Sequence, residues 1–130
     1  MKYLWIGLAG AAGALARYGL GLWVGGRLPL PFPLGTLLIN VTGSFLLGLV
    51  AGLGSDRGLI PPAWRAPIAV GFIGAYTTFS TWTVETVRLF EAGRLDLALG
   101  NVVLSLALGL PAVWLGLVVS RRRGAPRSRR

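Results

Sequence analysis

The stretch GFIGAYTTFSTWTVE, residues 71–85, decides the fold because it is polar where the surrounding pattern demands a membrane span. Between positions 77 and 86 the chain carries six hydroxyl side chains in ten residues. Glycines at 71 and 74 come just before this cluster and weaken a helix there. In hydrocarbon an unpaired polar group costs several kcal/mol, so irregular polar backbone survives only against protein, ion or water. We therefore expect a helix that is broken in mid-membrane and lines a pathway or site.

The composition is that of an integral membrane protein. The chain has 130 residues, a mean hydropathy of +0.68 and 13% charged residues, against about 25% in soluble domains. Its apolar residues form four blocks, each at least as long as the roughly 20 residues that cross about 30 Å of hydrocarbon. We expect an all-α integral membrane fold with four transmembrane helices per subunit. One domain, 1–120, would hold spans at about 3–24, 33–53, 66–90 and 95–120, followed by a basic tail, 121–130.

Short connections and missing residue types narrow the function. The three connections, GGRLPLPFP, GSDRGLIPP and EAGRLD, have turn chemistry and leave no room for a soluble catalytic module. Cysteine and histidine are absent, which excludes disulfides, thiol chemistry and imidazole ligands. Prolines at 61, 62 and 67 mark the entry to the third span, and Gly93 suits a helix C-terminus. We do not expect an enzyme.

The net charge of +9 comes mostly from six arginines in the tail. The tail follows a span directly and has no aromatic residues for base stacking, so we expect a positive-inside anchor and no nucleic-acid partner. Four spans place both termini on one side, and without the tail only three basic residues would face two. The tail therefore predicts cytoplasmic termini for a multi-pass protein of the inner (plasma) membrane.

Arg17 lies two-thirds along the first span. It can snorkel to the interface with its apolar stem along the helix. It can also draw anions to the mouth of a pathway, and a snorkelling guanidinium at a vestibule would do both.

The second span carries an amide in mid-membrane, Asn40. It either bonds a neighbouring helix or faces a pore as a donor, because Gly43 and Ser44 fall on the same helical face. Gly48 and Gly52 form a GxxxG pair, which predicts a close-packing surface.

Thr78, Thr81 and Glu85 form one polar stripe on the third span, bordered by Trp82 and, three residues before it, Phe79. Aromatic side chains in a span usually serve packing. Beside a hydroxyl stripe, however, their electropositive ring edges can hold an anion without a formal charge. An ionised Glu85 would repel anions, so we expect it near an end of the span, hydrogen-bonded by Thr81 or facing water.

The last span has one polar pair, Asn101 and Ser105, spaced i and i+4. The pair either completes the polar track of the third span or bonds a neighbouring helix.

Three segments together resemble the Fluc (CrcB) family of microbial fluoride channels. They are GAAGALARY in the first span, GTLLINVTGSFLLG in the second, and GFIGAYTTFST with Glu85 in the third. The resemblance implies an antiparallel dimer of four-helix subunits in the lipid membrane, either a homodimer or a pair with a homologous second chain. It also implies two fluoride pores along the subunit interface and one structural Na+ at the centre, which is not transported.

Carried onto this chain, the resemblance assigns the sodium ligands to the backbone carbonyls of Gly74 and Thr77 from each subunit. Asn40 matches the family's pore asparagine, and Phe79 matches its first pore phenylalanine. At the position of the second pore phenylalanine this chain has Trp82, which is a departure from the family pattern. With the residues singled out above, the expected fluoride pathway contains Asn40, Phe79, Trp82, Thr78, Thr81, Ser105 and Arg17. The basic tail is a second departure, because insertion in both orientations needs a nearly neutral charge bias.

Fluoride also suits the residue types themselves. The ion is small and strongly hydrated, so a pore must replace its water with hydrogen-bond donors that bind without trapping. Hydroxyls, an amide and ring edges are such donors. The first alternative is a small proton-coupled multidrug exporter with four spans, but this needs an acid deep in an early span, and the first two spans contain none. The second is a structural subunit of a larger complex, which the hydroxyl-rich third span fits poorly.

Overall fold

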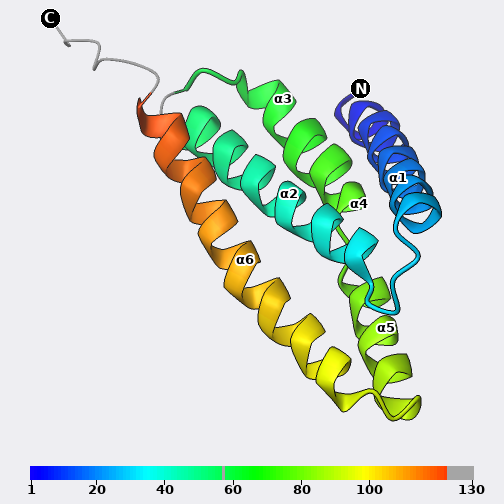
Figure 1. Cartoon of the computed structure of the whole chain (residues 1–130). Coiled ribbons are helices and arrows are strands. Elements are labelled where there is room, and N and C mark those ends of the chain that lie inside the picture. Colours follow the sequence, from blue (N-terminus) through cyan, green and yellow to red (C-terminus); the bar gives the residue numbers. More distant parts are fainter. Residues whose placement is uncertain (57, 123–130) are drawn as a thin grey trace, which may run out of the picture.

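The computed structural model describes residues 1–56 and 58–122, and the regular elements in them are all helices. Most of the basic tail, from residue 123 on, lies outside the described residues. In chain order the elements are α1 (Lys2–Arg27), α2 (Leu34–Ala51), π-helical η1 (Gly52–Asp56), α3 (Pro62–Ala66), π-helical η2 (Pro67–Ile73), α4 (Gly74–Tyr76), α5 (Phe79–Glu91) and α6 (Leu95–Arg122) (Figure 1).

The third predicted span is divided, as the sequence indicates, but the break lies further along than expected. Helical backbone runs without interruption from α3 through η2 to the end of α4. Thr77 (φ −77°, ψ 160°) and Thr78 (φ −150°, ψ 121°) are then extended before α5 begins. Gly74, expected to free the backbone, is helical itself, with φ −63° and ψ −35°. The break is therefore made by two threonines and not by the glycine.

Prolines and a glycine set the helix ends around this segment. Pro61 is the N-cap of α3 and Pro62 its first residue, where a missing N–H costs no helical hydrogen bond. After α5, Gly93 has φ 72°, a left-handed conformation that glycine adopts without strain. Its N–H donates to the carbonyl of Phe90 at 3.0 Å and closes the helix.

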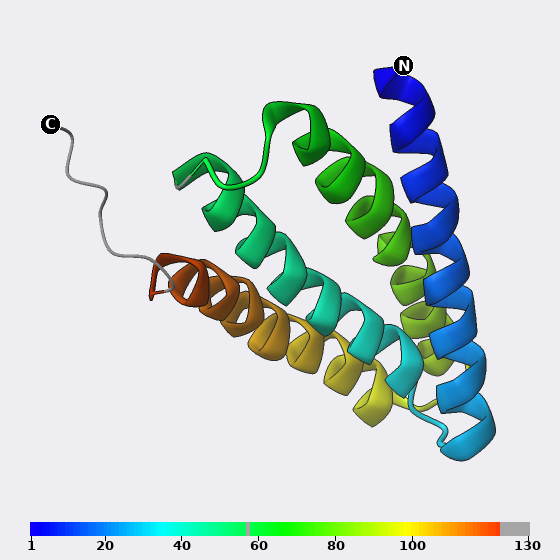
Figure 2. The same cartoon turned by 90° about the horizontal axis from the view of Figure 1, so that it is seen from above.

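Helices α2 and α6 lie side by side along most of their length, while α1 packs against η2 and α4 (Figures 1 and 2). The α2–α6 contact is backbone on backbone. A Cβ on Gly48 would overlap the carbonyl of Val113, and one on Gly116 would overlap the carbonyl of Phe45. Gly52 faces the side chain of Ser120. The close-packing surface predicted for the GxxxG pair is confirmed.

Two helical stretches are long and apolar enough to cross a membrane, Leu34–Ser55 and Leu95–Arg121. Helix α1 has 26 residues, but seven glycines and three basic residues make it less apolar. The third predicted span is split by the break. Four spans therefore remain a prediction.

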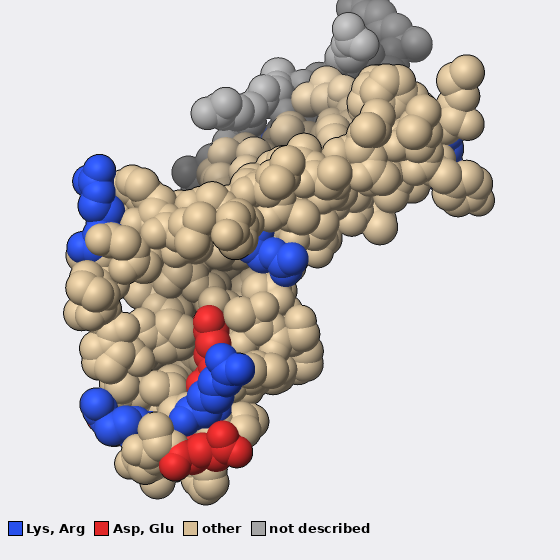
Figure 3. Space-filling view, turned by 90° about the vertical axis from the view of Figure 1, so that its right-hand side faces the viewer, with Lys and Arg blue, Asp and Glu red and all other residues tan. Residues whose placement is uncertain are grey.

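The surface of the described residues is divided between apolar and charged regions. Large apolar side chains, such as Leu99, Val103 and Leu110, are exposed along α6. Figure 3 shows a long surface with few charged side chains and, towards one end, acidic and basic side chains next to one another. This is the distribution expected of a chain whose middle contacts lipid or another subunit.

Candidate functional site

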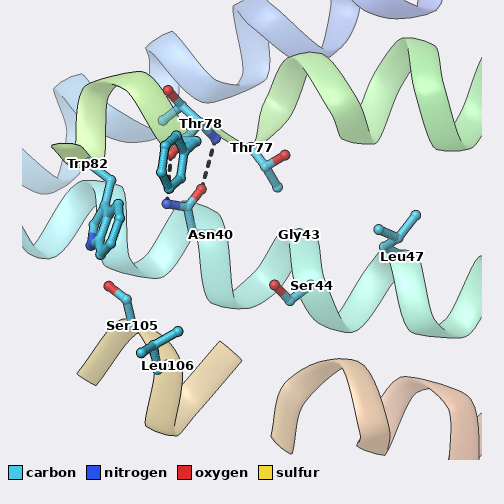
Figure 4. A pocket seen from close by; sticks show the side chains of 10 residues that line it. Asn40, Gly43, Ser44, Leu47, Thr77, Thr78, Trp82, Ser105 and Leu106 are labelled. Atoms are coloured by element: carbon cyan, nitrogen blue, oxygen red, sulfur yellow. Dashed lines mark hydrogen bonds between the residues drawn. The ribbon is translucent and has the colours of Figure 1, made fainter. Parts of the chain in front are cut away.

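A hollow of about 320 Å³ lies between α2, α5 and α6, beside the break. We call it the aromatic hollow (Figure 4). Its lining is Asn40, Gly43, Ser44, Leu47, Thr77, Thr78, Phe79, Trp82, Ser105 and Leu106. The structure thus brings together five of the seven residues predicted for the pathway, from three separate parts of the sequence. The other two, Thr81 and Arg17, lie elsewhere.

Asn40 braces the break. Its Nδ2 donates to the carbonyl of Thr78 at 2.9 Å, and its Oδ1 accepts from the N–H of Thr78 at 2.8 Å (Figure 4). The amide thus replaces the helical acceptor that the Thr78 N–H lacks, and it adds a donor to the Thr78 carbonyl. Gly43 lets the break come close to α2, because a Cβ there would overlap the side chain of Thr77. Asn40 combines both roles that its sequence context left open: it bonds another segment and also lines the hollow.

The break releases the backbone carbonyls at the end of α4, and those of Gly74 and Thr77 are among them. In a continuing helix Gly74 would accept from the N–H of Thr78, which is donated to Asn40 instead. Thr77 would accept from the N–H of Thr81, which is donated to the Thr78 hydroxyl at 3.2 Å. Gly74 is exposed and Thr77 partly exposed. The two carbonyl groups predicted for Na+ are hard oxygens without helical donors, and they fit such a cation.

The predicted aromatic pair is in contact. The ring centroids of Phe79 and Trp82 are 5.3 Å apart, with their planes tilted by 42°. Phe79 is 75% exposed, and one of its contacts within the described chain is the indole of Trp82. The indole N–H, however, is not a free donor, because it reaches the backbone carbonyl of Asn101 at 3.3 Å. What Trp82 offers to the hollow is a ring edge.

Arg17 and Thr81 line a second hollow of about 380 Å³ between α1, α2 and α5, together with Thr36, Thr78 and Glu85. We call it the Arg17 hollow. The stripe of Thr78, Thr81 and Glu85 therefore faces α1 and α2. Because Thr78 lines both hollows, the two meet at the break.

The predicted partner of Glu85 is wrong. Oε1 of Glu85 accepts from the Thr36 hydroxyl at 2.9 Å, whereas the Thr81 hydroxyl accepts from Thr78 at 3.0 Å. Oε2 is buried and has no hydrogen-bond partner within the described residues. Glu85 also lines a hollow of about 230 Å³ with Arg88 and the loop before α2, which agrees with its expected place near an end.

Asn101 and Ser105 diverge although they share a helix face. Asn101 is 0% exposed and its Nδ2 donates to the Thr86 hydroxyl at 2.9 Å, so it bonds a neighbouring helix. Ser105 lines the aromatic hollow, and its buried hydroxyl has no partner in the described part of the chain.

Three contributing residues were not found from the sequence: Thr36, Thr86 and Tyr76. Thr36 is one turn before Asn40 and could have been placed on its face from that spacing. Tyr76 is buried, and its hydroxyl lies 2.9 Å from that of Thr42, which ties the end of α4 to α2. Nothing in the sequence separates this tyrosine from a packing residue.

Comparison with known proteins shows which family the chain resembles. A family model described as CrcB-like protein, Camphor Resistance (CrcB), matches residues 4–117. The chain is 60% identical over 111 residues to the fluoride-specific ion channel FluC 2 of Symbiobacterium thermophilum, across 85% of this chain and 90% of that one. It is 53% identical over 122 residues to the fluoride-specific ion channel FluC of Acidobacterium capsulatum, across 94% and 98%.

These relatives are named as ion channels, which are membrane proteins and not enzymes. The absence of an enzymatic activity, expected from the sequence, agrees with that class. The family match and both alignments extend over most of the chain, and the matched residues 4–117 include the break and both hollows. The chain therefore belongs to the CrcB family.

Proposed function

We propose that the protein is a passive, fluoride-selective channel that lets fluoride leave the cytoplasm and so relieves fluoride toxicity. The names of the relatives support fluoride as the ion. The observation that carries the proposal is the aromatic hollow, where donors from α2, α6 and the break line the same space as an aromatic pair. Hydrogen fluoride crosses membranes as a neutral molecule and ionises in the cytoplasm. A passive exit for the anion therefore lowers the fluoride concentration there.

The donors of the aromatic hollow suit a small, strongly hydrated anion. Asn40 uses one Nδ2 hydrogen on Thr78 and has a second to offer. The hydroxyl of Ser105 has no protein partner in the described residues and can donate into the hollow. Phe79 and Trp82 add electropositive ring edges. None of these groups is a fixed cation, so fluoride can bind and leave again.

The Arg17 hollow would extend the pathway beyond the break. Its hydroxyls, Thr78 and Thr81, continue the donors of the aromatic hollow. Arg17 forms no ion pair within the described residues, so its charge is available to attract anions. Glu85 also lines the Arg17 hollow, and one of its carboxylate oxygens accepts a hydrogen bond from the Thr36 hydroxyl.

The working unit would be an antiparallel dimer, a homodimer or a pair with a homologous second chain, with four spans per subunit in the inner membrane. Two features support a second subunit: the exposed Phe79 ring and the apolar face of α6. The tail arginines favour cytoplasmic termini, and deleting residues 121–130 should allow both orientations. Labelling of a cysteine introduced at a terminus reports the orientation. Labelling from both sides in the full-length protein would show that dual insertion overrides the tail.

A structural Na+ would bind the freed carbonyls of Gly74 and Thr77 from both subunits, four oxygens in all. Its charge would be balanced by carbonyl dipoles, and it would hold the two breaks together without moving. A determined dimer structure checks this at the axis. Water-like density surrounded by donors, or electroneutral flux coupled to a cation, would contradict the assignment.

Ion efflux from liposomes tests the channel. Vesicles that contain the purified protein and fluoride should discharge once the membrane potential is shunted, whereas chloride-loaded vesicles should retain their anion. Empty vesicles give the leak. Equal chloride flux, or a strict dependence on a proton gradient, would refute a fluoride channel, and the second result would favour the proton-coupled exporter.

A further inference from the structure

Three hydrogen bonds link Trp82, Thr86 and Asn101 in a closed ring between α5 and α6. The indole N–H of Trp82 donates to the Asn101 carbonyl at 3.3 Å. Nδ2 of Asn101 donates to the Thr86 hydroxyl at 2.9 Å. That hydroxyl donates to the Trp82 carbonyl at 2.8 Å. We call these three residues the indole latch.

The Thr86 hydroxyl decides how the latch is oriented. Its one hydrogen is committed to the Trp82 carbonyl, so it can only accept from Asn101. Asn101 must then present its NH₂ group, and at 0% exposure it has no water to turn to. The 2.9 Å bond fixes α5 against α6. The indole bond is longer, just beyond the usual range of N–H···O distances, and depends on that register.

The latch removes the strongest donor of Trp82 from the hollow. In Figure 4 the indole nitrogen lies on the side of the ring turned away from Asn40. The hollow therefore meets carbon edges, as it would with two phenylalanines. An N–H···F⁻ bond is charge-assisted and much stronger than an edge contact. Asn40 and Ser105 already supply donors to the hollow. Conduction requires binding weak enough to permit exit, so an indole N–H added to these donors would hold the ion too tightly.

We propose that Thr86 and Asn101 are positioning residues that hold the indole N–H of Trp82 out of the ion pathway, so that a tryptophan can serve there without trapping the anion. The role rests on the proposed fluoride channel. Neither residue need touch the ion. Their effect passes through the orientation of one ring and, by the 5.3 Å contact, to Phe79.

A double-mutant cycle in the liposome assay tests the latch. Thr86→Val removes the hydroxyl with little change in shape, leaves Nδ2 of Asn101 without its acceptor and frees the indole. Fluoride flux should fall by about threefold to twentyfold, the range that follows from single interhelical hydrogen bonds in membranes. Trp82→Phe keeps a ring edge and has no N–H, so it should lose less flux than Thr86→Val. In the Trp82→Phe background, Thr86→Val should cost less than about twofold, so the phenylalanine rescues the valine.

Two controls separate the latch from general damage to α5. Thr86→Ser keeps the hydroxyl and should retain most of the flux. Thr83→Val removes an exposed hydroxyl that bonds the Ser80 carbonyl, outside the latch, and should have little effect. Equal losses from Thr86→Val in both backgrounds would overturn the proposal, since a merely structural role would not depend on the indole.

A second measurement does not depend on transport. The indole N–H proton of Trp82, identified in the magnetic resonance spectrum by its loss in Trp82→Phe, should exchange slowly with solvent. Thr86→Val should accelerate that exchange at least tenfold and Thr86→Ser should not. Fast exchange in wild type would refute the latch. If wild type carries no fluoride while the proton is protected and Thr86→Val exposes it, the channel assignment fails and the role of the latch in conduction fails with it, but the bonding survives.

Discussion

The α2–α6 pair and the broken third segment both bury backbone against a neighbour, but they do so by opposite means. In the pair, glycines bring one helix backbone onto the other, as Gly48 does at Val113 and Gly116 at Phe45. At the break, helical hydrogen bonding is given up and side chains replace it. There Asn40 serves both backbone groups of Thr78, and the Thr78 hydroxyl serves Thr81.

This difference separates stability from function in the molecule. A continuous helix satisfies its own backbone, so the close-packed glycine face of the α2–α6 pair needs no polar partner from another element. The break needs polar partners from other elements. Once they are present, hydroxyls and an amide line the hollow and can meet an ion. The consequences of substitution should follow the same division.

The largest effect is expected from Gly48→Val. Its side chain would overlap the backbone of α6 at Val113, which cannot move aside as a flexible side chain can. We expect a loss of about 3 kcal/mol, the upper end of overpacking, and little monodisperse protein. Gly19→Val in α1, where no atom lies within 4 Å of the added Cβ, is the matched control. Equal yields and unfolding temperatures would show that α2 and α6 do not pack this closely.

The next largest effect is expected from Asn40→Asp, which should keep the fold intact and abolish fluoride flux. The carboxylate loses the donor to the Thr78 carbonyl and sets oxygen against oxygen in the brace. Flux in the liposome assay should fall by about 100-fold, corresponding to roughly 3 kcal/mol for an unpaired charged group. Ser44→Ala, on the same face and in the same hollow, should do less because Ser44 makes no bond to the break. Wild-type conduction by Asn40→Asp would remove Asn40 from the pathway.

Phe79→Ile should have a smaller effect. The ring edge is lost while most apolar volume is kept, so flux should fall by about twofold to tenfold, with the proposed dimer unchanged by size-exclusion chromatography. Phe90→Ile is the control on the same helix, since Phe90 is also exposed but has no ring partner in the described chain. Normal flux through Phe79→Ile would make that ring a packing residue only.

The parts of the fold that depend on local sequence patterns could be predicted. The length of the apolar blocks predicts long helices, and α2 and α6 follow those blocks within a few residues. The GxxxG spacing identifies the close-packed face of α2. The hydroxyl cluster predicts a break in the third segment, because backbone groups without helical partners need polar side chains nearby to bond them in any fold.

Partners distant in the sequence could not be predicted. Thr36 and Glu85 are 49 positions apart, and the indole of Trp82 meets Asn101 19 positions away. Helical spacing places each residue on a face, but the rotation of the opposite helix decides which side chain it meets. The break was expected at Gly74 but lies at Thr77 and Thr78, where Asn40 from α2 bonds the backbone of Thr78.

The smallest effect is expected from Gly74→Ala, which separates the two kinds of glycine. Gly74 is helical and exposed, and an added Cβ would meet only the carbonyl of Ala69, at an ordinary 3.6 Å. Alanine favours a helix by about 1 kcal/mol over glycine, so stability should hold or rise by up to that amount, and the freed carbonyl remains. Thermal unfolding and size-exclusion chromatography check this beside Gly48→Val. If the proposed dimer is lost while helix content is kept, a second subunit's backbone lies against Gly74, and the glycine serves assembly instead of the break.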